Sequence, residues 1–400
     1  MSRDAYIVEA VRTPIGRRKG MLSGWHPADL LSEVLRDVVA RAGVDPAQVD
    51  DVIVGCLDQV GEQGVNIARS ATLAAGFPES VPAVTIDRQC GSSQQAAHFA
   101  AQGVMAGAYD VVIAAGVESM TRVPMWANAP DPSAPYGPRF RARYGLADDF
   151  FVDQGESGEM IADRFELTRE ELDAFAVESH RRAADATEAG RFRDEILPVA
   201  AEKDGREWTA DADEGIRPGT TLEGLAGLRT VFREDGRLTA ATSSQLSDGA
   251  AAMLIVSEEA AGRLGLHPRA RFHAFAVAGV DPIEGLAGPI PSTQKALERA
   301  GLEADDIGLF EVSEAFASVP LAWSRALGVD MARVNVNGGA ISLGHPLGCS
   351  GARLMTTLVH EMGRRGARFG LQTMCEGGGM GNATILELVN GNGAGGGSGS

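Results

Sequence analysis

The sequence predicts an α/β protein made of two similar halves, with a polar segment inserted into the first. Apolar runs of strand character alternate with segments of helical spacing, which is typical of α/β folds with a mostly parallel sheet. A strand, a glycine-rich turn, a helix and a second strand ending in glycine occur in this order twice, around Cys90 and around His345. The repetition indicates an internal duplication, with the functional site where the halves meet.

The first half is expected to cover residues 1–120 and 242–266. Leucine and valine recur at helical spacing over residues 28–42, and an alanine-rich helix is expected at 92–106, directly after Cys90. A small-residue helix is expected at 66–75. The predicted strands of this half are residues 5–11, 49–55, 81–86, 109–116 and 248–256.

Residues 121–241 are expected to form the inserted loop domain. Prolines between positions 124 and 138 interrupt regular structure. A charged helix is predicted over 168–189, where Thr168 and Glu171 have the spacing of a capping box.

The second half is expected over residues 267–390. Its repeat of the first half predicts a strand at 333–336, a helix at 351–364 and a strand at 370–374. The glycine- and serine-rich residues 391–400 have the composition of a flexible linker and are excluded from the predicted fold.

Length and charge limit the classes of protein to which the chain can belong. Its 400 residues exceed what one hydrophobic core normally supports, so we expect two or three packed units. The 54 acidic and 36 basic residues give a formal net charge of −18. This charge argues against a nucleic-acid or membrane-surface role, although a few arginines and backbone N–H groups can still bind an anionic ligand.

The sequence carries no pattern that predicts a membrane span or export. It contains no run of about 18 apolar residues, and its N-terminal segment lacks the apolar region and cleavage site of a secretory signal. The four cysteines are too few for a disulfide framework and include no CxxC pair. We therefore expect a reduced, cytoplasmic protein with no zinc site.

Cys90 is the first candidate catalytic residue, because it lies between a predicted strand and the start of a helix. The positive end of that helix is expected to lower the pKa of the thiol and to make it nucleophilic. Cysteine is also often a small buried core residue. The polar neighbours Arg88, Gln89, Ser92 and Ser93 favour the nucleophile.

His345 and Cys375 also lie in glycine-rich turns. Pro346 favours extended backbone at His345, and a histidine there can accept a thiol proton; the alternative is a surface-loop histidine. Cys375 precedes Glu376 and three glycines. It can act as a general acid or base, with the backbone N–H groups of residues 377–379 as an oxyanion hole, or it can be a structural cysteine.

Taken together, these turns resemble motifs of the thiolase family, and the resemblance covers nearly the whole chain. Thiolases have two related halves that form a layered α/β/α/β/α core, together with an inserted loop domain, as expected here. The segments that carry the resemblance are VRTPIG (11–16), SDGAAA (247–252), GPIP (288–291), GGAISLGHPLGCSGAR (338–353) and CEGGGMG (375–381).

The resemblance implies a role for each candidate residue. Cys90 is the nucleophile that becomes acylated, and His345 deprotonates it and later activates coenzyme A. Cys375 protonates the departing acetyl-CoA enolate, or removes the α-proton in the condensing direction. The N–H groups of Cys90 and Gly377 form one oxyanion hole.

The second oxyanion hole of the family combines His345 with a water held by the asparagine of an NEAF motif. Here the motif reads SEAF, so Ser313 stands in place of that asparagine; a hydroxyl can still hydrogen-bond water. The resemblance also places Ser244 and Phe316 in the coenzyme A site and Arg217 at its nucleotide end. Coenzyme A is then a co-substrate, and we expect no permanent cofactor, no metal, and a homodimer or homotetramer.

Two subtypes of the family compete, and the sequence favours the degradative 3-ketoacyl-CoA thiolase over the biosynthetic acetoacetyl-CoA thiolase. Gln154 stands where acetyl-specific enzymes commonly carry methionine, and Gln245 where biosynthetic enzymes favour glycine. Arg139, Arg141 and Arg143 either face a polar acyl chain or form a solvated surface.

Two alternatives from other classes are less consistent with the motifs. A decarboxylating condensing enzyme typically has histidine or asparagine in place of Cys375. A non-catalytic acyl-CoA-binding relative would have lost one of the three reactive residues, and only Ser313 supports it.

Overall fold

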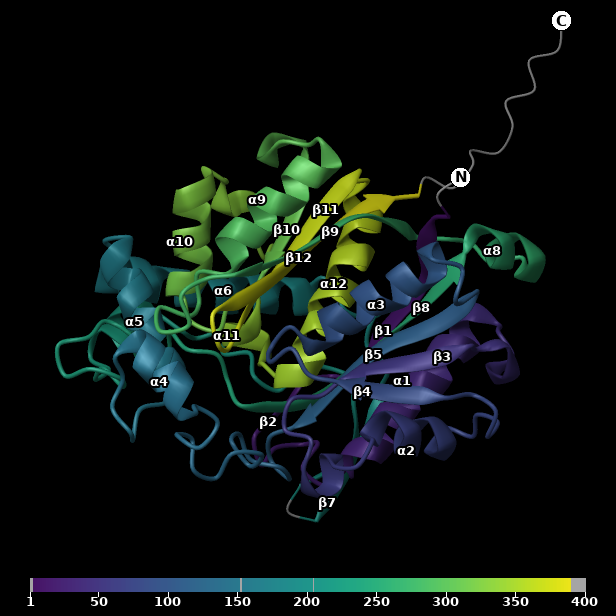
Figure 1. Ribbon diagram of the computed structural model, residues 1–400, viewed down its shortest axis with the longest axis horizontal. Helices are drawn as coiled ribbons and strands as arrows, with labels where there is room; N and C mark the ends of the chain where they lie inside the picture. Colours follow the sequence, from purple (N-terminus) through teal and green to yellow (C-terminus); the bar gives the residue numbers. More distant parts are fainter. Residues whose placement is uncertain (1–2, 152, 204, 390–400) are drawn as a thin grey trace, which may run out of the picture.

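The computed structural model describes residues 3–151, 153–203 and 205–389 (Figure 1). The predicted linker at 391–400 lies outside the described residues, as do residues 1, 2 and 390 of the two predicted halves. Within the described ranges, ten strands form one sheet in the order β10-β11-β12-β9-β1-β8-β5-β3-β4, with the short β2 paired to β8. The predicted α/β class is confirmed.

The expectation of a mostly parallel sheet is wrong. Among the strands of the described residues, only the pairs β10–β11, β3–β4 and β3–β5 are parallel. The strand β8 returns from the inserted segment and pairs antiparallel with both β1 and β5, and β11 and β12 are joined by a tight turn that allows only antiparallel pairing.

The two halves of the sheet join where Tyr6 and Ile7 of β1 pair with Arg271 and Ala270 of β9. The first half contains β1 (Ala5–Arg12), β2 (Gly16–Arg17), β3 (Asp51–Gly55), β4 (Ala83–Ile86), β5 (Val111–Ser119) and β8 (Ser247–Ser257). The second contains β9 (Ala270–Gly279), β10 (Leu309–Val312), β11 (Phe369–Glu376) and β12 (Met380–Leu388).

Helices form three layers around the two half-sheets. The central layer is the pair α3 (Ser92–Met105) and α12 (Ser350–Arg365), whose buried residues contact strands of both halves. The first half is covered on its other face by α1 (Pro27–Ala42) and α2 (Ile67–Ala74), and the second by α9 (Pro289–Ala300) and α10 (Ser318–Leu327). This gives the expected α/β/α/β/α order.

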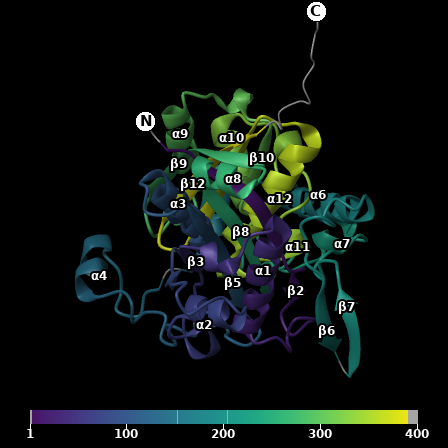
Figure 2. The same ribbon diagram turned by 90° about the vertical axis from the view of Figure 1, so that its right-hand side faces the viewer.

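The inserted segment packs beside this core and has its own two-stranded sheet. Thr168 and Glu171 form the predicted capping box at the start of α6. Figure 2 shows α4 and the β6–β7 hairpin projecting on opposite sides of the molecule. The elements of the segment are α4 (Pro138–Tyr144), α5 (Gln154–Arg164), α6 (Arg169–Glu188), β6 (Val199–Lys203), β7 (Arg206–Ala210) and α7 (Leu222–Ala226).

The predicted strand at 333–336 does not form. Asn335 has a φ of 47°, which breaks an extended run. Its side-chain oxygen accepts from the N–H of Val312 at 2.8 Å and its amide donates to the carbonyl of the same residue at 2.9 Å. Asn335 thus imitates a strand partner, and β10 takes the place in the second half that was predicted for this segment.

The remaining short elements connect these layers. They are α8 (Glu258–Leu264), α11 (Ala340–Leu343) and the 3₁₀ turns Pro46–Gln48, Gly61–Gln63, Ala304–Asp306, Met331–Arg333 and Leu347–Cys349.

Candidate active site

Parallel strands position three of the candidate residues. Cys90 follows β4, Ser313 follows β10, and Cys375 lies near the end of β11. The carboxyl ends of parallel strands are the usual place for a site in α/β sheets. His345 joins them from the turn that leads into α12, so each of the two central helices begins beside a reactive side chain.

Glycines allow these helices to approach the sheet and each other. A side chain at Gly55 would put its Cβ 2.2 Å from the backbone nitrogen of Ser93, and one at Gly351 would come within 2.3 Å of that of Gln94. Both contacts lie in the first turn of α3. The start of this helix, and Cys90 with it, is therefore held against β3 and α12.

The Cys90 thiol is buried, with 2% of the residue exposed. Gln89 before it has a φ of 49°, a strained conformation for a residue with a side chain. Burial, helped by Cys375 and Glu376 nearby, raises the pKa of the Cys90 thiol well above its usual value. The expectation that the helix would lower this pKa is wrong, because burial outweighs the helix terminus. The thiol is protonated at neutral pH and requires a base.

His345 meets this requirement. Its backbone N–H donates to the Gln245 carbonyl at 3.0 Å and contacts the Ser247 hydroxyl at 3.1 Å. Burial, with Arg353 nearby, lowers its pKa to about 4, so the imidazole is neutral at pH 7. A neutral imidazole can accept the proton of Cys90.

Hydrogen bonds determine which nitrogen of His345 is available to accept a proton. The Ser350 hydroxyl lies 2.6 Å from Nδ1 and donates its own proton to the Pro346 carbonyl at 2.8 Å. It must therefore accept from Nδ1–H, which leaves Nε2 with a free lone pair. Nε2 is buried and has no protein partner in the described part of the chain.

Cys375 is fully buried, and its Sγ donates to the Ser313 hydroxyl at 3.5 Å. Burial raises its pKa to about 11, against the opposing effects of Ser313 and the backbone N–H of Ala315. Cys375 is therefore a protonated thiol at neutral pH, suited to donating a proton. Ser313 touches this thiol directly, and its role in holding a water stays a prediction.

Glu376 follows Cys375 and is also buried. Burial raises the pKa of its carboxyl to about 8, and neither oxygen has a hydrogen-bond partner among the described residues. Its Oε1 would lie 2.0 Å from a Cβ at Gly91, so the carboxyl touches the turn that holds Cys90. A neutral Glu376 is the form compatible with a thiolate at Cys90.

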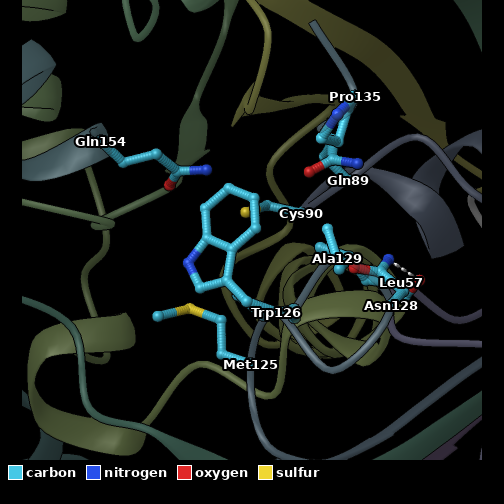
Figure 3. A pocket seen from close by; sticks show the side chains of 10 residues that line it. Leu57, Gln89, Cys90, Met125, Trp126, Asn128, Ala129, Pro135 and Gln154 are labelled. Atoms are coloured by element: carbon cyan, nitrogen blue, oxygen red, sulfur yellow. Dashed lines mark hydrogen bonds between the residues drawn. The ribbon is translucent and has the colours of Figure 1, made fainter. Parts of the chain in front are cut away.

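Three adjoining cavities surround these residues. The Cys90 cavity, of about 310 Å³, contains Cys90 and Gln89 among its lining residues (Figure 3). The His345 cavity, of about 340 Å³, is lined by His345 together with Ser244 and Phe316. The Gly377 cavity, of about 250 Å³, is lined by Gly377 and Gln89.

The structure thus places Cys90, His345, Gly377, Ser244 and Phe316 on adjoining cavities, with Cys375 and Ser313 in contact behind them. Arg217 is exposed and lines none of the three, so its contact with the nucleotide end of coenzyme A stays a prediction.

Arg139, Arg141 and Arg143 are likewise absent from the linings of the three cavities. Arg141 donates to the Ser133 carbonyl at 2.9 Å, and Arg143 lies over the ring of Tyr144. Arg139 and Arg143 are exposed, as in the alternative of a solvated surface, whereas the side chain of Arg141 is largely buried outside the three cavities.

Sequence reasoning missed several residues that build the site. Ser350 orients His345, and its position five residues beyond the histidine was a usable signal. Glu118 at the end of β5 accepts from the N–H groups of Leu57 at 2.8 Å and Gly348 at 2.9 Å, and so ties the two halves together. Trp126 lies in the proline-rich segment, where no periodicity predicts its position.

The duplicated layered core, with a cysteine and a histidine at the starts of its two central helices, defines the class of cysteine-dependent acyltransferases. The model of the thiolase N-terminal domain matches residues 5–259, and that of the thiolase C-terminal domain matches residues 266–388. The chain belongs to the thiolase family.

Two curated relatives match nearly the full chain. The chain is 48% identical over 394 residues to a steroid 3-ketoacyl-CoA thiolase of Mycobacterium tuberculosis, covering 96% of this chain and 94% of the relative. It is 44% identical over 396 residues to a 3-ketoacyl-CoA thiolase of Bacillus subtilis, covering 96% and 100%.

Two solved structures have the same fold. The Bacillus anthracis acetyl-CoA acetyltransferase matches with a TM-score of 0.89 and 39% identity, and human mitochondrial 3-ketoacyl-CoA thiolase with a TM-score of 0.88 and 37% identity. Each match covers 97% of this chain and 99% of the other.

Proposed function

We propose that this protein cleaves 3-ketoacyl-CoA with coenzyme A, giving acetyl-CoA and a shortened acyl-CoA through an acyl group carried on Cys90. The observation that carries the proposal is a combination of protonation states on adjoining cavities: His345 is a neutral base, and Cys90 and Cys375 are protonated thiols. Cleavage needs a thiol nucleophile with a base and, separately, an acid for the leaving carbon. The relatives named 3-ketoacyl-CoA thiolase support this direction.

In the first half-reaction, Nε2 of His345 removes the proton of Cys90. The sulfur attacks the 3-keto carbon, and the bond between C2 and C3 breaks. Its electron pair forms the acetyl-CoA enolate, whose carbon takes the proton of Cys375. The N–H groups of Cys90 and Gly377 are proposed to hold the oxyanion of the tetrahedral intermediate.

In the second half-reaction, the proton on His345 returns to Cys375, and His345 is again a neutral base. It deprotonates coenzyme A, whose sulfur attacks the acyl carbon on Cys90. The thiolate of Cys90 leaves and recovers a proton from His345. We place the pantetheine arm along the His345 cavity, against Ser244 and Phe316, because this cavity brings it to the base.

The biosynthetic direction is the second candidate, favoured by the likeness to an acetyl-CoA acetyltransferase structure. Gln154 separates the two subtypes, because it lines all three cavities where a methionine would crowd the acyl site. Gln245 instead donates to the carbonyls of Gly215 and Ile341, at 3.0 and 2.8 Å, and supports the His345 turn.

The test is a thiolysis assay with coenzyme A across acetoacetyl-CoA, a medium-chain 3-ketoacyl-CoA and a bulkier one. We expect a higher kcat/KM on the medium-chain substrate than on acetoacetyl-CoA and a fast burst of acyl-enzyme, which Cys90→Ser removes. Activity confined to acetoacetyl-CoA would reverse the subtype. An undiminished burst in Cys90→Ser would refute the nucleophile.

We also propose a cytoplasmic homodimer or homotetramer. No helix in the described ranges is both long and apolar enough to cross a bilayer. Size-exclusion chromatography with light scattering measures the assembly directly.

A further inference from the structure

Trp126 occupies an unusual place among the three cavities. Only Trp126 and Gln154 line the Cys90, His345 and Gly377 cavities alike, among the described residues. In the view of Figure 3 the indole lies in front of the Cys90 sulfur, with the Gln154 amide on one side and Gln89 on the other. The indole is therefore part of the wall between the nucleophile and the other two cavities.

The backbone holds this indole in a conformation that needs support. Trp126 has a φ of 71°, which is rare for a bulky side chain and persists only where neighbours enforce it. The buried Asp58 carboxyl accepts from the N–H of Asn128 at 3.2 Å and interacts with that of Trp126. The Asn128 side chain also donates to the Leu57 carbonyl at 3.3 Å. The loop is thus anchored at the tryptophan and two residues after it.

The lining of the Cys90 cavity indicates which acyl groups it accepts. It is formed by apolar side chains and neutral amides, and no charged side chain lines it in the described part of the chain. A carboxylated acyl end would lose its hydration there without gaining a partner. Leu57 and Leu347 instead offer apolar contact next to the thiol.

We propose that Trp126 determines specificity by acting as a partition: it confines the acyl group to the Cys90 cavity and selects uncharged acyl chains of up to medium length over long or polycyclic ones. This proposal rests on the proposed thiolytic function and names its substrate class. Gln154 completes the partition, because it is the other residue shared by all three cavities. Replacing the indole with a small side chain joins the cavities and admits long or polycyclic acyl groups.

The experiment compares kcat/KM for 3-ketohexadecanoyl-CoA and a polycyclic 3-ketoacyl-CoA with that for acetoacetyl-CoA. We expect Trp126→Ala to raise the ratio of large to small substrate by about tenfold or more, the scale of a few methylene contacts, and Trp126→Phe to raise it less. Trp208→Ala serves as a matched control, because Trp208 lies on β7, away from these cavities. The control should leave the ratio unchanged.

A ratio that is unchanged in Trp126→Ala, with acetoacetyl-CoA still cleaved, would overturn the partition. An equal loss of kcat/KM on all substrates in folded Trp126→Ala and Trp126→Phe would also overturn it. That result would mean that the indole supports the structure of the site and does not select among acyl groups. Selectivity in wild type for a 3-keto dicarboxylic acyl-CoA would overturn the charge preference.

A second readout separates this proposal from the proposed function. Alkylation of Cys90 by a small haloacetamide and by a bulky maleimide is followed by mass spectrometry of the intact protein. Trp126→Ala should narrow the difference between the rates of Cys90 alkylation by the haloacetamide and by the maleimide. This result is expected even if the wild type cleaves no 3-ketoacyl-CoA. Equal narrowing in Trp208→Ala, or none in Trp126→Ala, refutes the partition itself.

Discussion

At the scale of single residues, the protonation states of the site residues depend more on their burial than on which side chains neighbour them in the sequence. Cys90, His345 and Cys375 were identifiable because each lies in a glycine-rich turn. The protonation state of Cys90 was not, because the groups that bury the thiol come from Leu57, Leu347 and other distant positions. Sequence reasoning therefore identified a candidate nucleophile, whose role stays a prediction, and predicted the wrong direction for its pKa.

Ser350 offers the most direct test at this scale. Ser350→Ala removes the acceptor for Nδ1–H, so Nε2 is no longer kept free as the base. We expect kcat/KM to fall by about ten- to a hundredfold, a part of what a positioned acid–base group contributes. The measurement is a pH profile of thiolysis, in which wild type keeps activity until His345 protonates near its pKa of about 4.

Ser350→Thr is the control, because it retains the hydroxyl and should recover most of the activity. A profile and rate for Ser350→Ala that match wild type would show that another group selects the tautomer.

At the scale of elements, helices with clear apolar periodicity were predicted well, and in the second half the strand predicted at 370–374 matches β11 while other strands were missed. The helices at 28–42 and 168–189 match α1 and α6 closely. The strands β9 and β12 were not predicted, and the strand at 333–336 was predicted in error. Strand pairing depends on partners that are distant in sequence. At 333–336 the side chain of Asn335, rather than a strand backbone, hydrogen-bonds to Val312 of β10, and the apolar pattern of the segment does not reveal this.

Glu118 links three elements, and its substitution tests how firmly they are joined. One oxygen accepts from the N–H groups of Leu57 and Gly348, and the other from Asp58 N–H and the Gln63 amide. Glu118→Gln replaces either oxygen with a donor and leaves two buried donors without acceptors. We expect a loss of about 1–3 kcal/mol for each, measured by chemical denaturation.

The pH dependence of this variant has a defined sign. Burial raises the pKa of Glu118 from 4.5 to about 7, so the folded protein holds this proton more tightly than the unfolded chain. The contribution of Glu118 protonation to the free energy of unfolding is fully present below about pH 4.5 and is lost as the pH rises through about 7. The difference in Tm between wild type and Glu118→Gln should shrink over that range, and a difference that grows would contradict this assignment.

At the scale of the whole molecule, the duplication and the insertion were both predictable from the order of motifs. The contacts that join the two halves to each other, and the insertion to the first half, were not predictable. The halves meet through β1 and β9, which pair over only a short stretch. The insertion is anchored through Arg12 of β1, whose guanidinium lies 2.7 Å from both Glu195 and Asp213 with all three side chains buried. No local pattern in the sequence pairs these three residues.

Arg12→Ala tests this anchor. Two buried carboxylates lose their partner, and we expect about 3–5 kcal/mol of destabilisation. Arg17→Ala, which removes a more exposed pair with Glu214 at 3.1 Å, should cost about 0–1 kcal/mol. Urea unfolding measures both, and similar losses in the two variants would show that the buried arginine does not anchor the insertion.

Peroxide attacks thiolates that it can reach, and the cysteines of the resting protein are held mainly as protonated thiols. All four cysteines are free and buried, and burial raises the pKa of each. In the proposed mechanism, Cys90 becomes a thiolate only while His345 holds its proton, when an acyl chain already fills the adjoining space. We therefore expect peroxide to oxidise Cys90 of the idle enzyme more slowly than a free cysteine, without a resolving cysteine or a repair partner.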